Sequence, residues 1–231
     1  MPRTGAGGGS NRSGGSLPAL GNVNVTRVWR LLSWSAPIAS VSIFIALYSL
    51  AAFLYPGGTR IDPARRGFSF FDNYWCDLLD VTTYGGFANP ARPVALTAMT
   101  ILCAGLGMLW WAAPVLFPAA TRRARVVRAS GVGCALLVPC VGSTFHDLAI
   151  HCAGLLGVVA FVATVTATGA LGRRSTFVAW CVLVIVAVNY IVWQTRVGLQ
   201  FLPFIQKIAF AAFLAWVILL SLRVRQVYLS P

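Results

Sequence analysis

The chain has 231 residues, of which 58% are hydrophobic and only 10% are charged, and its mean hydropathy is +0.78. A soluble domain carries about 25% charged residues, so this composition excludes an ordinary soluble globular protein and indicates a membrane protein. The formal net charge of +13 does not indicate a nucleic-acid partner, because the basic residues punctuate apolar runs instead of clustering on one polar face.

The N-terminal segment reads MPRTGAGGGSNRSGGSLPAL and is rich in glycine and serine. Such a segment cannot bury enough apolar surface to become ordered, so we predict a flexible tail over residues 1–26. We expect no signal peptide, because the first apolar run exceeds the roughly 7–15 residues of a signal core. A membrane domain is expected over 27–225, followed by a short tail over 226–231.

Six apolar runs approach or exceed the length of about 20 residues that a spanning helix needs. They predict membrane spans at about 31–55, 93–117, 130–146, 149–172, 176–195 and 204–222. Between the third and fourth spans, the stretch STFHDLAIH offers almost no loop. Asp147 is expected to accept a hydrogen bond from a free amide in the first turn of the fourth helix, which favours a tight helical hairpin. The alternative is one long buried helix and a count of five.

Basic and near-neutral connections alternate along this pattern. Twelve arginines and no acid lie before the first span, between the second and third, and after the fourth and sixth; the remaining segments carry six basic residues and all five aspartates. Because Lys and Arg accumulate on the cytoplasmic side, we predict an all-α, six-helix bundle with both termini cytoplasmic, in the inner membrane of a bacterium. Five spans would place the last basic segment on the wrong side.

A long outer loop is predicted over 56–92, and its middle reads FSFFDNYWCDLLD. If this stretch is a short helix, Asn73, Asp77 and Asp80 recur at i, i+4 and i+7 and share one face. The helix would lie at the membrane interface or fold back over the mouth of the bundle. Two interpretations remain: an aromatic belt with solvated acids, or one wall of a binding site, since long loops are often functional.

The fourth span begins with the only two histidines of the chain. Asp147 and His151 are four residues apart and can share a helical face, where the carboxylate would orient the imidazole; a turn near 145–147 would bring His146 to them. These three are candidate catalytic residues. Zinc takes three or four such ligands, so His146, His151, Asp77 and Asp80 are candidate zinc ligands. The competing interpretation is a structural role, in which these polar residues cap the helix and hold the hairpin against the outer loop.

Lys207 lies near the outer end of the last span, in FIQKIAF. It is predicted either to snorkel to the membrane surface or to pair with an outer aspartate. Together with Arg196, at the same mouth, and with Asn73, Asp77 and Asp80, it completes the set of candidate binding residues.

Six cysteines lie mostly within the apolar runs. This placement is typical of small packing residues. A disulfide between Cys76 and Cys152 is an open alternative if both face an oxidising compartment, and spacing alone does not decide it.

The order of these features resembles the prokaryotic six-helix membrane family called domain of unknown function 998. The resemblance covers about residues 30–225 and rests on FSFFDNYWCDLLD, FHDLAIHCAG and GLQFLPFIQKIAF, with Gln206-Lys207 where the family has Gln-Arg. It implies architecture and no activity. The gathering of Ser, Asp and His among membrane helices is more weakly similar to alkaline ceramidase-like hydrolases, which hold zinc. Those proteins have seven helices and a late HxxxH pair that this chain lacks.

Three functions compete. The scarcity of catalytic motifs favours a non-enzymatic membrane protein that binds a lipid or small amphiphile, or assists an envelope process. The gathered acids and histidines favour a membrane hydrolase acting on a lipid, with His146, His151 and an aspartate holding a metal. A small-molecule transporter ranks third, because it would need more polar groups deep in the spans. The expected partners are the bilayer and a lipid-like ligand; no oligomeric state is predicted.

Overall fold

The computed structural model of the protein describes residues 25–117, 122–167 and 172–229. The predicted flexible tail lies almost entirely outside these residues. The described part is all-helical; it has no β-strand, and only two isolated antiparallel bridges occur, Gly57 with Arg66 and Thr82 with Ala88.

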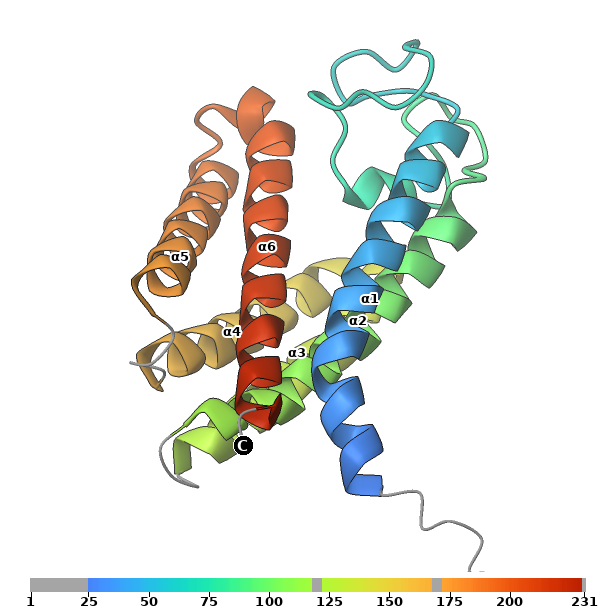
Figure 1. The fold of residues 1–231 in the computed structure, drawn as a ribbon. Coiled ribbons are helices and arrows are strands. Elements are labelled where there is room, and N and C mark those ends of the chain that lie inside the picture. The colour runs from blue at the N-terminus through green and yellow to red at the C-terminus, as the bar shows by residue number, and fades with distance from the viewer. Residues whose placement is uncertain (1–24, 118–121, 168–171, 230–231) are drawn as a thin grey trace, which may run out of the picture.

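Six α-helices make up the bundle (Figure 1). They are α1 (Val25–Leu54), α2 (Arg92–Ala112), α3 (Arg122–Leu137), α4 (His146–Ala167), α5 (Gly172–Thr195) and α6 (Leu202–Leu229). Four short 3₁₀-helices accompany them: η1 (Cys76–Leu79), η2 (Ala113–Leu116), η3 (Val138–Gly142) and η4 (Leu199–Phe201).

Five of the described helices are long and apolar enough to cross a membrane. The spanning segments are Val28–Leu54, Arg92–Leu116, Asp147–Ala167, Ser175–Thr195 and Leu199–Leu229. The helix outside this set is α3, because its first two turns read RRARVVR. The structure therefore has the character of an integral membrane protein with five spanning helices, and a sixth crossing would have to be made by α3 and η3 together.

The segment predicted as the third span, 130–146, is divided in the structure. The α-helix begins earlier, at Arg122, and gives way to η3 one residue before Pro139, which has no N–H to continue the α-helical bonds. The chain then turns: the Ser143 hydroxyl donates to the Cys140 carbonyl at 2.6 Å and accepts from the Phe145 N–H at 3.2 Å. Since α4 starts directly afterwards and packs along α3, this stretch is not one long helix.

Neighbouring helices pack in an open ring. Each of the pairs α1/α2, α3/α4 and α5/α6 forms a hairpin, and α1 packs on α6 while α2 packs on α3. The sequence of contacts is thus α5–α6–α1–α2–α3–α4. Within their described residues, the two ends of this series, α4 and α5, scarcely touch each other.

Two glycines allow the close contacts that α2 makes with its neighbours. A Cβ at Gly105 would lie 1.9 Å from the hydroxyl oxygen of Ser40 on α1, and a Cβ at Gly131 would lie 2.2 Å from the Trp110 ring. Membrane helices lack a strong hydrophobic drive to associate and depend on such close approach. Small residues therefore fix the α1/α2 and α2/α3 spacing.

The two ends of the bundle differ chemically. Figure 1 shows the long α1–α2 connection and η4 at one end, and the start of α1 and the end of α6 at the other. At the latter end, three guanidinium groups stack on rings of adjacent helices: Arg30 on Tyr228, Arg225 on Trp34 and Arg128 on Trp111. We call this the basic end.

Candidate functional site: a cap over a central cavity

Residues 55–91, which connect α1 to α2, fold into a compact unit that we call the cap. Its first turn requires glycine: Gly58 has φ +93°, and a Cβ there would lie 2.4 Å from the Gly85 N atom. The Gly58 carbonyl accepts hydrogen bonds from the Tyr55 hydroxyl at 3.2 Å and from Asn73 Nδ2 at 2.9 Å. The two halves of the cap are thereby held together.

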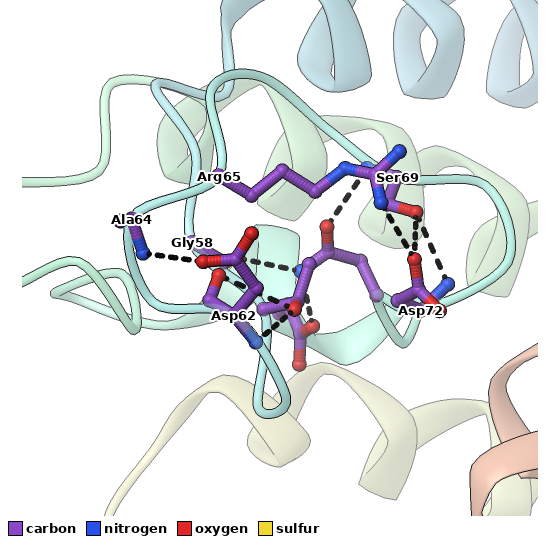
Figure 2. Close-up of polar contacts among 9 residues, drawn as sticks. Gly58, Asp62, Ala64, Arg65, Ser69 and Asp72 are labelled. Atoms are coloured by element: carbon purple, nitrogen blue, oxygen red, sulfur yellow. Dashed lines mark hydrogen bonds and ion pairs between the residues drawn. The ribbon is translucent and has the colours of Figure 1, made fainter.

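Figure 2 shows polar contacts in the first half of the cap, around Asp62, Arg65 and Asp72. The Asp72 carboxylate forms an ion pair with Arg65 at 2.9 Å and accepts from the Ser69 hydroxyl at 2.6 Å. The Asp62 carboxylate accepts from the Ala64 N–H at 3.1 Å. Three of the five aspartates, Asp62, Asp72 and Asp77, thus hold the cap in shape.

The helix expected in FSFFDNYWCDLLD is reduced to the four residues of η1. Asn73 Oδ1 accepts from the Ser69 N–H at 2.8 Å, which closes a turn before the helix can start. Asn73 and Asp77 are both buried, with 0% and 3% of their surface exposed. Asp80 is exposed and has an extended backbone, so the predicted common face of Asn73, Asp77 and Asp80 is wrong for its third member.

Asp77 is a buried carboxylate with two hydrogen-bond donors. It accepts from Asn73 Nδ2 at 2.8 Å and from the Tyr74 N–H at 2.9 Å. Burial raises its pKa to about 6, although both hydrogen bonds and the nearby Lys207 charge act in the opposite direction. Desolvation therefore outweighs the favourable contacts.

Lys207, on α6, is 3% exposed, so the prediction that it snorkels to the surface is wrong. Its ammonium group donates to the carbonyl oxygens of Asn73 and of Pro203. Three cap rings surround it, with centroids 5.3–5.5 Å away: Phe68, Phe70 and Trp75. The direct partners are thus carbonyl groups and ring faces, and Asp77 acts on it through its charge.

Two further hydrogen bonds join the cap to α6 and α1. The Trp75 N–H donates to Gln206 Oε1 at 3.0 Å, and the Tyr48 hydroxyl donates to the Trp75 carbonyl at 3.2 Å. The far side of the cap is fixed to the start of α2 by Arg92, whose Nε donates to the Leu79 carbonyl at 3.0 Å. Within the cap, Asn89 Nδ2 donates to the carbonyls of Asp77, Leu78 and Asp80. The cap is therefore attached to three helices and covers the mouth of the bundle.

A cavity of about 470 Å³ lies beneath the cap. All six α-helices and η1 contribute to its lining, which is apolar over most of its surface; the described residues that line it include no Asp, Glu, Lys, Arg or His. Its polar groups come from Tyr48, Gln206, the Trp75–Cys76 segment and two thiols, those of Cys103 and Cys134. The cavity is half-open rather than sealed.

The predicted catalytic residues lie in the first turns of α4. Asp147 and His151 are exposed, and His151 Nδ1 lies 2.6 Å from the backbone oxygen of Asp147. The helix begins at His146, whose side chain falls outside the described part. Arg196, predicted to line the mouth, is exposed in the α5–α6 connection and stacks on Trp193 at 4.3 Å.

Among the described residues, no group of three or more His, Cys, Asp and Glu side chains is placed to hold a metal ion. The predicted zinc set includes His146, so it stays a prediction. Cys76 and Cys152 are free thiols, and burial raises the pKa of Cys76 to about 12. This thiol is a protonated group at neutral pH.

Three residues that organise this site, Tyr48, Gln206 and Asn89, are not among the candidate site residues predicted from the sequence, although Gln206 belongs to the motif GLQFLPFIQKIAF. Gln206 is a polar residue next to Lys207 in an otherwise apolar segment, and Asn89 precedes a proline just before a helix begins. Both positions could therefore have been chosen as site candidates from the sequence. Comparison of the chain with protein-family models, with curated proteins and with solved structures gives no match.

Proposed function

We propose that this protein is a non-enzymatic membrane protein that binds a lipid or another amphiphile in the central cavity beneath the cap. The cavity carries this proposal, because its volume of about 470 Å³ falls in the range of about 300–1,000 Å³ typical of small-molecule sites. Its lining matches an apolar chain, and its few polar side chains match a small polar group.

The polarity within the site supports an amphiphile over a polar metabolite. Tyr48, Gln206 and the Trp75–Cys76 segment all belong to the cap or contact it. Deeper residues such as Trp110 and Phe161 are apolar rings that pack on Trp216. A ligand with one polar end and one apolar end fits this gradient.

We further propose an inner-membrane location with the basic end facing the cytoplasm. The support is the charge distribution: Arg30, Arg128 and Arg225 lie at the basic end, while Asp62, Asp72, Asp77 and Asp80 belong to the cap at the opposite end. Lys and Arg set orientation in this way.

The test fills the cavity at a position that tolerates a side chain. Gly154 on α4 lines the cavity, and a Cβ there meets no atom within 4 Å. Gly154→Phe is expected to remove most lipid that co-purifies with the protein, as measured by native mass spectrometry from detergent. The helix itself should not suffer, because Phe is a better helix former than Gly.

Leu155→Phe is the matched control, because Leu155 is 68% exposed on the neighbouring position of the same helix. It introduces the same ring outside the cavity and should leave the bound lipid unchanged. Equal lipid occupancy in the Gly154→Phe and wild-type proteins would contradict the proposed function.

A further inference from the structure

We propose that the cavity selects an uncharged lipid whose polar end carries a carbonyl or ester oxygen, and that Gln206 Nε2 donates the hydrogen bond that recognises it. This inference rests on the proposed function and adds the class of ligand. Three observations support it: the charge of the described lining, the orientation of the Gln206 amide, and the hydrogen bonds that already occupy the ammonium group of Lys207.

The lining excludes charged ligand groups. Among the described residues, the lining contains no Asp, Glu, Lys, Arg or His, so a phosphate or carboxylate in the cavity would lose its hydration without gaining a counter-charge from them. Burial of an unpaired ion is far more costly than burial of an uncharged polar group. An uncharged polar end is the group that this lining accommodates.

The orientation of the Gln206 amide is fixed by its partner. A backbone N–H can only donate, so the atom that faces the Trp75 N–H at 3.0 Å must be the amide oxygen. The Nε2 group is then the free end of the amide, with two donors and no hydrogen-bond partner among the described residues. Because the other end is already held, little conformational freedom remains to be lost when a ligand acceptor binds.

Two of the other polar groups at this end do not compete as donors: the Tyr48 hydroxyl already donates to the Trp75 carbonyl at 3.2 Å, and the Cys76 thiol is a weak donor. The buried Trp75 indole N–H has no hydrogen-bond partner among the described residues and is a second donor at this end. Gln206 offers two N–H groups where the indole offers one, and donors recognise acceptor oxygens. A carbonyl or ester is the uncharged acceptor that lipids commonly present.

Lys207, the nearest cation, is engaged elsewhere. Its ammonium group bonds to the Asn73 and Pro203 carbonyls, and Trp75, one of the three rings around it, also lines the cavity. Lys207 itself is not part of the lining. The ammonium group therefore already has its hydrogen-bond partners outside the lining, so it offers no direct contact to an anionic lipid headgroup in the cavity.

The experiment compares three probes that share one long alkyl chain: a monoacylglycerol ester, the corresponding glycerol ether, and the fatty-acid anion. Binding to the full-length protein in detergent is measured by native mass spectrometry titration. The wild type is expected to favour the ester over the ether by about fivefold, the equivalent of one net hydrogen bond, and to bind the anion more weakly than either.

Two variants of Gln206 isolate the donor. Gln206→Leu removes the amide, and Gln206→Glu keeps an acceptor for the Trp75 N–H while removing Nε2. Both are expected to abolish the ester preference. Gln200→Leu, at an exposed position in η4, is the control and should keep it.

The outcomes separate the two proposals. Equal binding of ester and ether by the wild type, an unchanged preference in both Gln206 variants, or tighter binding of the anion would overturn the carbonyl inference, even if Gly154→Phe abolishes all binding. Undiminished binding of every probe by Gly154→Phe would overturn the proposed function itself.

Discussion

Lys207 shows how a lysine inside an apolar helix is accommodated without an ion pair in direct contact. Two carbonyl oxygens accept from its ammonium group, and three aromatic faces lie within 5.5 Å of it. Hydrogen bonds to a charged group and desolvated cation–π contacts are among the stronger local interactions in proteins. Because these partners belong mostly to the cap, the lysine fastens the cap to α6.

Lys207→Met keeps most of the apolar stem and removes the charge. We expect a loss of about 2–3 kcal/mol in stability, since the Asn73 carbonyl loses a charged donor in a buried place. The cap should also loosen, so trypsin should cut faster at the exposed cap residues Arg60, Arg65 and Arg66. Thermal unfolding in detergent and a timed trypsin digest measure the two effects.

Arg196→Met is the control for Lys207→Met, because it removes an exposed cation that stacks on Trp193. A stability change below about 0.5 kcal/mol is expected for such a surface position. Equal effects of the two substitutions, or an unchanged rate of trypsin cleavage in Lys207→Met, would show that the lysine does not hold the cap.

Asp77 makes the stability of the cap depend on pH. Its folded pKa of about 6 lies above the value of 3.8 for an exposed carboxyl, so the folded state binds this proton more tightly. The contribution is fully present below about pH 3.8 and is lost as the pH rises through about 6, by up to about 3 kcal/mol.

Asp77→Asn removes the titration and keeps an acceptor for the Tyr74 N–H. Between pH 4.5 and pH 7.5, the wild-type protein should lose stability relative to this variant, as measured by thermal unfolding in detergent. Asp62→Asn, in the exposed part of the cap, should keep the wild-type pH dependence. A difference of the opposite sign would contradict the assignment of a raised pKa to Asp77.

At the scale of the helices, the α1/α2 contact depends on the absence of a side chain at Gly105. Gly105→Ala would place a methyl group 1.9 Å from the Ser40 hydroxyl oxygen, so the helices must separate, whereas Gly107→Ala would meet Ala135 at an ordinary 3.7 Å. We expect the first substitution to destabilise by about 1–3 kcal/mol, as overpacking does, and the second to be neutral or stabilising. Thermal unfolding of the two variants gives the comparison, and equal stabilities would contradict it.

The helical elements were the most predictable part of this molecule, because long apolar runs admit few other structures in a bilayer. The all-helical fold and the membrane-spanning character of five helices follow from composition and run length. The third span was the least predictable: hydropathy extended it to 146, but Pro139 and the Ser143 turn end the helix earlier, and α3 with its basic start is not among the five described helices long and apolar enough to span.

The site was less predictable, because it depends on contacts between distant segments. The sequence indicated that Asn73, Asp77 and Lys207 matter, and the structure brings these three together. It gave no means to see that Gln206 meets the Trp75 backbone across 131 residues, or that Asp80 leaves the face of its neighbours. Helical periodicity fails in the cap because side chains and glycine turns, not a helix, set its backbone.

At the scale of the whole molecule, the separation of charge predicts the orientation in the membrane. Trypsin added to right-side-out spheroplasts should cleave in the cap, at exposed arginines such as Arg60, and spare the segment Arg122–Arg128. Inverted membrane vesicles should show the reverse pattern. Cleavage of the Arg122–Arg128 segment in intact spheroplasts would overturn the proposed orientation.

The open ring of helices has a consequence for how a molecule reaches the interior. Trp75, Cys76 and Leu79 of the cap line one end of the cavity, whereas α4 and α5 both line it and scarcely touch each other within their described residues. Access is therefore easiest sideways, from among the acyl chains. A guest would be drawn from material already dissolved in the bilayer, so its loading should follow its mole fraction in the membrane rather than its concentration in water.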